Sequence, residues 1–155
     1  MQQPDSLNQV AEFHRTFHAP VLETPQIPSE ARCQLRVSLL AEELDELRDA
    51  IAERDIVAVA DALCDLQYVL SGAVLEFGLG HQFKALFDEV QRSNMSKACL
   101  TVEEAEATVG QYTAKGVACH YMESEGKYLV FRDADRKTLK SVNYSPADLE
   151  GILYK

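Results

Sequence analysis

Two stretches of the sequence carry carboxylates at a spacing that suits a divalent metal ion. Between residues 41 and 65 the chain has nine acidic residues and only two basic ones. In a helix, Glu43 and Glu46 lie one turn apart on one side, and Asp61 and Asp65 share an i, i+4 row. Hard cations such as Mg²⁺ bind carboxylate oxygens and keep room for water and phosphate. The spacing predicts a metal site formed by these four residues on two neighbouring helices.

The helices that carry these acids differ in their apolar pattern. The first, expected over 30–53, has an apolar stripe that we expect to face the core; its members are Val37, Leu40, Leu44, Leu47 and Ile51. The second, expected over 55–77, is apolar on nearly every side, which predicts a buried helix. An unpaired buried carboxylate is costly. Asp61 and Asp65 on such a helix therefore favour a bound cation over a solvated acidic face.

The remaining pattern predicts a mainly α protein, a bundle of four to five helices with a small α-β-β appendage. Further helices are expected over 6–18 and 81–96, with a proline-rich connection at 19–28. Thr101 and Glu104 fit a capping box for a short helix that ends near Gly116. Strands are expected over 117–122 and 127–132 around an Glu125-Gly126 turn, and Ser145 with Pro146 predicts the start of a last helix.

This pattern divides the chain into a helical catalytic body (1–99), a small insertion (100–133) and a closing segment packed on the body (134–155), within one domain. The net charge of −10 disfavours binding to nucleic acid or anionic membranes. No apolar run appears long enough to span a membrane, and the first residues do not resemble a secretory signal, so a cytoplasmic location is expected. The apolar surface of the two long helices predicts a homodimer or homotetramer.

Several motifs together resemble a known superfamily. They are Glu42-Glu43-Leu44-Asp45-Glu46, the Asp61–Asp65 segment, the run from Phe87 to Lys97 and the run from Leu139 to Leu149. The pattern resembles the all-α nucleoside triphosphate pyrophosphohydrolases, the MazG-like superfamily that includes dimeric dUTPases and phosphoribosyl-ATP pyrophosphohydrolase. Residues 100–133 look like an insertion to which the resemblance gives no role.

The resemblance implies Mg²⁺-dependent cleavage, with Mn²⁺ as a possible substitute, of a nucleoside triphosphate between its α and β phosphates. Water is the nucleophile, and the products are the monophosphate and pyrophosphate. Glu43, Glu46, Asp61 and Asp65 would bind metal, and Glu42, next to them, would orient or deprotonate the water. The resemblance further assigns phosphate contacts to Asn94 and Lys97, and Lys140 and Tyr144 are expected to bind the substrate by folding over it.

One position departs from the superfamily pattern. Its Glu-x-x-Asp motif would place glutamate at position 62, where this chain has Ala62. Asp61 precedes it and stays on the same helix face as Asp65, so Asp61 is predicted to substitute. The departure leaves an alternative open, a nucleotide-binding regulatory module that has lost catalysis. The base is also open: deoxyuridine, deoxycytidine, a damaged nucleotide and phosphoribosyl-ATP all fit the pattern.

Overall fold

The chain folds into two units that divide after Phe83 in the computed structural model, which describes residue 2 and residues 4–154. Helices make up 56% of the structure, and a two-stranded antiparallel sheet lies in the C-terminal part. The prediction of a mainly helical fold with a small β appendage is confirmed.

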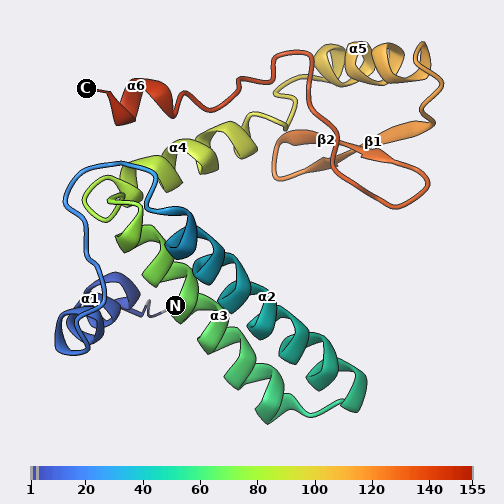
Figure 1. The fold of residues 1–155 in the computed structure, drawn as a ribbon. Coiled ribbons are helices and arrows are strands. Elements are labelled where there is room, and N and C mark those ends of the chain that lie inside the picture. The colour runs from blue at the N-terminus through green and yellow to red at the C-terminus, as the bar shows by residue number, and fades with distance from the viewer. Residues whose placement is uncertain (1, 3, 155) are drawn as a thin grey trace. The chain divides into compact units, whose positions relative to one another are not determined.

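The first unit is built on an antiparallel helix pair (Figure 1). Helix α2 (Glu30–Glu53) packs along α3 (Ile56–Glu76), and α1 (Ser6–Thr16) packs on α3. The turn between α2 and α3 needs only two residues, because Arg54 adopts the left-handed conformation and Asp55 caps α3. The Asp55 carboxylate accepts hydrogen bonds from the backbone N–H groups of Val57 and Ala58 at 2.9 and 3.1 Å. This tight turn fixes which residues of the two helices lie opposite each other.

The predicted burial of these helices is wrong over much of their length. Val37, Leu44 and Ile51 of the α2 stripe are 67%, 56% and 59% exposed. In α3 the buried residues are Ala62 and a group near the C-terminal end, whereas Ile56 and Val57 are more than 70% exposed. Near the C-terminal end of α3, Leu75 is buried against Val10 and Ala11 of α1. Periodicity identifies an apolar face but not what covers it.

Helix α3 is also long and apolar enough to cross a membrane when judged by length and composition alone. The core helix of a soluble protein passes the same test. The composition of α3 therefore does not support the expectation that no segment is long and apolar enough to span a membrane. The absence of a membrane partner stays a prediction. Cys64 on this helix is exposed, although the apolar pattern predicted a buried helix.

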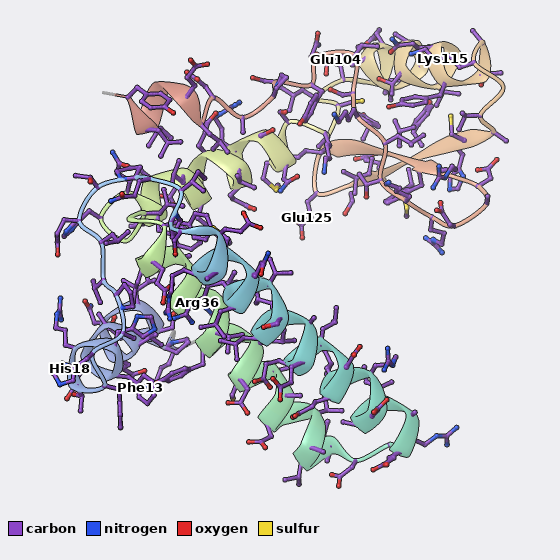
Figure 2. The ribbon with its side chains drawn as sticks, viewed as in Figure 1. Phe13, His18, Arg36, Glu104, Lys115 and Glu125 are labelled. Carbon is purple, nitrogen blue, oxygen red and sulfur yellow. The ribbon has the colours of Figure 1, made fainter. Side chains whose placement is uncertain are left out.

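The second unit contains α4 (Phe83–Met95), α5 (Val102–Thr113), β1 (Cys119–Ser124), β2 (Lys127–Arg132) and α6 (Glu150–Leu153). Glu125 and Gly126 join the strands, and both have positive φ, 51° and 73°, as a type I′ hairpin turn requires. Figure 2 marks this turn at Glu125 and α5 at Glu104. The core of this unit lies where α5 meets the strands, and its buried members are Cys99, Ala105, Val130 and Leu139.

Of two helix starts predicted from the sequence, one is confirmed and the other is wrong. Thr101 caps α5 as predicted, accepting from the Glu104 N–H at 3.2 Å, while the Glu104 carboxylate accepts from the Leu100 N–H at 2.8 Å. The helix expected from Ser145 and Pro146 is wrong, because α6 begins only at Glu150. The segment around Ser145 instead bonds to α4 and to the residue just after it: Arg92 Nη1 of α4 donates to Ser145 Oγ at 3.0 Å, and the Ser145 N–H donates to Ser96 Oγ at 2.9 Å.

Candidate active site

Two of the predicted metal ligands line one pocket in the first unit. Glu43 of α2 and Asp65 of α3 are half-buried on the wall of an open pocket of about 430 Å³. Aromatic side chains form another part of the wall, where the Phe13 and Tyr68 rings meet edge to face with 5.6 Å between centroids. Because the short α2–α3 turn sets the helix register, Glu43 and Asp65 are brought to the same pocket although they lie 22 positions apart in the sequence.

The five predicted acids of this unit lie close enough to influence one another. Burial raises the pKa of Glu43, and the negative charges of four neighbours raise it further; in decreasing order these are Asp65, Glu46, Glu42 and Asp61. In the described part of the chain, none of the five forms an ion pair with a basic residue. Glu43 therefore lies at the centre of an uncompensated negative cluster.

The side-chain positions do not by themselves form a coordination shell. Glu42, Glu46 and Asp61 are exposed, and within residues 2 and 4–154 no three acidic, histidine or cysteine side chains converge as metal ligands. The donor set nevertheless suits a hard divalent cation, because it consists of carboxylates whose charge nothing else balances. Ala62, at the position of the superfamily glutamate, is only 3% exposed, whereas Asp61 beside it is exposed.

A buried ion-pair cluster that the sequence analysis missed lies on the same pocket. Arg32 and Arg36 of α2 both donate hydrogen bonds to the Glu76 carboxylate of α3, which has no exposed surface. Burial alone would raise the pKa of Glu76, but the hydrogen bonds from the two guanidinium groups lower it. Both arginines line the pocket. Their pairing with Glu76 explains why neither neutralises Glu43.

His14 and Gly72 complete this cluster around Arg36, which is labelled in Figure 2. His14 Nδ1 lies 2.8 Å from the Pro20 carbonyl oxygen, and its Nε2 lies 3.3 Å from Arg36 Nη2. A neutral ring with its proton on Nδ1 satisfies both partners, because a guanidinium can only donate. A Cβ at Gly72 would lie 2.7 Å from Arg36 Nη1 and 2.9 Å from His14 Nε2. Glycine in the middle of α3 therefore leaves room for the cluster. The pairing of Arg36 with Glu76, 40 residues later, has no local sequence signal.

The four predicted substrate-binding residues form two contacting pairs in the second unit. Lys97 Nζ donates to Asn94 Oδ1 at 2.7 Å, and Lys140 Nζ lies 4.2 Å from the centroid of the Tyr144 ring. The Ser93 hydroxyl donates to Tyr144 Oη at 3.0 Å. This hydrogen bond lowers the pKa of Tyr144, and the charges of Lys140 and Lys97 lower it further. Both lysines thus lie near one phenol oxygen, and the group can accept an anion.

Comparison with known proteins shows which family the sequence matches and over which residues. A family profile described as phosphoribosyl-ATP pyrophosphohydrolase matches residues 10–94, more than half of the chain. An uncharacterised protein of Acanthamoeba polyphaga mimivirus, L479, is 31% identical over 97 residues, which cover 57% of this chain and 37% of that relative. The chain thus spans little more than a third of the length of that curated relative. The family match includes every predicted acidic residue and Asn94, and it ends before Lys97.

Proposed function

The chain belongs to the phosphoribosyl-ATP pyrophosphohydrolase family, which indicates nucleotide pyrophosphohydrolase chemistry and general divalent-metal dependence, and on this premise we propose that it is a Mg²⁺-dependent nucleoside triphosphate pyrophosphohydrolase. The proposed reaction converts a ribo- or deoxyribonucleoside triphosphate and water into the monophosphate and pyrophosphate. Mn²⁺ is expected to replace Mg²⁺.

The observation that supports this proposal best is the uncompensated cluster around Glu43. Two carboxylates face one pocket and three more raise its negative potential, while the nearby arginines are bound to Glu76. A protein with a net charge of −10 needs cations to bind an anionic triphosphate. Glu43, Glu46, Asp61 and Asp65 are the residues proposed to hold the ion. A bound divalent cation supplies charge neutralisation at the phosphates and a more acidic water.

The proposed chemistry uses few protein groups. The water oxygen attacks the α-phosphorus, the bond from this phosphorus to its bridging oxygen breaks, and pyrophosphate leaves with the bonding electrons. Glu42 is exposed and adjacent to the proposed ligand pair, and it is the candidate to orient the water and accept its proton. Asn94, Lys97, Lys140 and Tyr144 are proposed to contact the substrate, and the charges of Lys140 and Lys97, which both act on Tyr144, support binding of phosphate oxygens there.

A pyrophosphate-release assay on the full chain tests this proposal. Common ribo- and deoxyribonucleoside triphosphates, oxidised nucleotides and phosphoribosyl-ATP are each assayed with Mg²⁺, with Mn²⁺ and with EDTA. The proposal predicts equimolar monophosphate and pyrophosphate from at least one compound, with no turnover in EDTA. Release of inorganic phosphate without pyrophosphate, or turnover that EDTA does not affect, contradicts it.

The buried Ala62 supports a second candidate, a nucleotide-binding module without catalysis. Such a module would gain thermal stability from Mg²⁺ with a nucleotide but release no pyrophosphate. In an active enzyme in which Asp61 replaces the superfamily glutamate, Asp61→Ala should reduce turnover about as severely as loss of Asp65. Adding Ala62→Glu to Asp61→Ala should then restore part of it, because a glutamate reaches further than an aspartate. An active chain that tolerates Asp61→Ala excludes Asp61 as a ligand and leaves the enzyme proposal intact.

We also propose that a second copy of the chain covers the exposed apolar face of the helix pair. Leu44, Leu47 and Ile51 line an apolar groove on α2, with Asp45 and Arg48 at its border. In a two-fold dimer the same groove faces itself, so acidic and basic borders can pair across the axis. Sedimentation at micromolar concentration should give a dimer or tetramer mass, and a monomer contradicts the proposal. The expected location of this assembly is cytoplasmic.

A further inference from the structure

The segment that carries Lys140 and Tyr144 is held at its first half by the insertion. This part of the closing segment (134–155) comprises residues 139–148. The Leu139 N–H donates to the Val130 carbonyl of β2 at 2.8 Å, and the Lys140 N–H donates to Tyr112 Oη of α5 at 3.2 Å. The Val142 N–H donates to Thr108 Oγ1 of α5 at 3.0 Å. Three backbone groups within four residues therefore bond to a part of the chain outside the family match.

Thr108 is built into this contact more deeply than a surface threonine would be. Its side chain has no exposed surface. Its hydroxyl donates to the Glu104 carbonyl one turn earlier in α5 at 2.7 Å, which leaves an oxygen lone pair for the Val142 N–H. Because its single proton is used within the helix, the hydroxyl can only accept from Val142, and its direction is fixed. Leu139 is buried in the core that contains Val130 and Ala105.

The second half of the closing segment is held by α4. The Ser145 N–H donates to Ser96 Oγ, and the Asp148 N–H donates to the Glu89 carboxylate at 2.8 Å. The hydrogen bonds from Arg92 and from the Asp148 backbone hold the pKa of Glu89 at about 2, so the carboxylate remains an acceptor at neutral pH. Lys140 and Tyr144 thus lie within a stretch that is anchored by α5 and β2 on one side and by α4 on the other.

We propose that the α5–β1–β2 insertion is a scaffold that positions Lys140 and Tyr144 for phosphate binding, with Thr108 and Tyr112 as its positioning residues. The inference rests on the proposed function for the role of Lys140 and Tyr144. The closing segment contains no helix or strand before α6, so its backbone has few interactions of its own. Binding groups on such a loop must be held to within about 0.5 Å by supporting contacts. The insertion supplies these contacts where the family pattern has none.

Kinetics of matched variants of the full chain test the proposal. Thr108→Val keeps the shape and removes the acceptor, Thr108→Ser restores a hydroxyl, and Tyr112→Phe removes the other acceptor. Tyr121→Phe is the control, because Tyr121 lies on the exposed strand β1 and its ring contacts Tyr128. Thr108→Val and Tyr112→Phe should raise KM for the triphosphate about 3- to 10-fold, the effect of losing roughly one hydrogen bond. The kcat and the Mn²⁺ affinity of the free protein should stay within about twofold.

Rescue separates positioning from general stability. Thr108→Ser should return KM to within about twofold of the parent, and Tyr121→Phe should leave it unchanged. Equal KM values for Thr108→Val and the parent, or equal impairment in Thr108→Ser and Thr108→Val, overturn the proposal. If Thr108→Val loses the helical circular-dichroism signal, Tyr112→Phe decides: a raised KM supports the proposal, and a parental KM overturns it.

Amide hydrogen exchange tests the scaffold without relying on catalysis. Exchange in peptides that cover residues 139–147 should speed up in Thr108→Val and Tyr112→Phe and stay parental in Tyr121→Phe. If the parent releases no pyrophosphate from any triphosphate, the proposed function fails, and the exchange result still decides whether the insertion holds the closing segment. Parental exchange in both positioning variants overturns the scaffold.

Discussion

The two units place their candidate functional groups by different means. In the first, Glu43 and Asp65 lie on paired helices whose register is set by a two-residue turn, and the cluster at Glu76 joins the same helices. In the second, Lys140 and Tyr144 lie on a segment without regular structure that is held by separate hydrogen bonds to α4, α5 and β2. Helices fix side chains by local geometry, whereas the closing segment depends on individual tertiary contacts.

The candidate functional groups of the two units also differ in their electrostatics. Burial and repulsion among acids raise the pKa of Glu43, whereas the hydrogen bond from Ser93 and the charges of Lys140 and Lys97 lower the pKa of Tyr144. The acidic cluster around Glu43 is therefore suited to a cation, and the lysines around Tyr144 are suited to an anion. Variants of the acidic cluster should change metal binding and stability together, and variants of the lysines should change substrate affinity alone.

The largest effect is expected at the acidic cluster. Asp65→Asn removes the negative charge of a proposed metal ligand from the pocket. It should reduce turnover more than about 100-fold, because loss of a residue that only supports a metal ligand already costs about 10- to 100-fold. Mg²⁺ binding, followed by calorimetry, should be lost. The melting temperature without metal should rise, because repulsion at Glu43 is relieved. Asp49→Asn, on the exposed side of α2 beside Arg48, is the control and should behave like the parent. Near-normal turnover in Asp65→Asn would falsify the metal site.

The buried ion-pair cluster should have the next largest effect. Glu76→Gln leaves two guanidinium groups without their counter-charge and should cost about 3–5 kcal/mol in the free energy of unfolding. Because the folded-state pKa of Glu76 is lowered from its ordinary 4.5, its stabilisation is present above pH 4.5 and lost as the pH falls through the lower folded value. Urea titrations from pH 7 to pH 3 should show a shallower acid-side decline in Glu76→Gln. Glu53→Gln, on the exposed end of α2, is the control and should retain the parental dependence of stability on pH. If Glu76→Gln retains it as well, the predicted contribution of Glu76 to acid-dependent stability is contradicted.

A smaller, purely kinetic effect is expected in the second unit. Lys97→Ala should raise KM for the triphosphate about tenfold, as expected for the loss of one charge-assisted hydrogen bond. The Mg²⁺ affinity of the free protein should not change, because a lysine cannot be a metal ligand while charged. Lys84→Ala, at an exposed lysine of α4 that is paired with Asp88, is the matched control. Equal kinetics in Lys97→Ala and Lys84→Ala would return Lys97 to an ordinary surface charge.

The smallest effects should differ in sign between the units. Gly72→Ala places a Cβ against Arg36 and His14 and should destabilise the fold by about 1–3 kcal/mol, as overpacking does. Gly110→Ala in α5 meets nothing within 4 Å and should stabilise the fold by about 0.5–1 kcal/mol, the usual gain in a helix interior. Thermal or urea unfolding of both variants measures the difference. Two changes of the same sign would show that the cluster at Gly72 has room to move.

The sequence by itself determined the elements and the chemistry of the candidate site. The bounds of α2 and β2 were predicted at 30–53 and 127–132 as observed, because hydrophobic periodicity, breakers and turn residues act over a few neighbours. The acidic motif followed from residue type and spacing on two helices, and the family followed from the resemblance of several motifs to a known superfamily. Burial was predicted poorly, since an apolar face such as Val37–Leu44–Ile51 shows the same pattern whether or not the chain itself covers it.

Only the tertiary structure decided which residues meet across long separations. Glu76 pairs with arginines 40 and 44 residues away, and Thr108 accepts a hydrogen bond from a backbone group 34 residues later. It also decided that Ser145 bonds to α4 and does not start a helix, because the Ser96 and Arg92 side chains bind the backbone or hydroxyl there. No local sequence pattern encodes such contacts, because each depends on where two distant elements pack. A side chain can form the same hydrogen bonds with many partners, so the tertiary packing decides which partner it has.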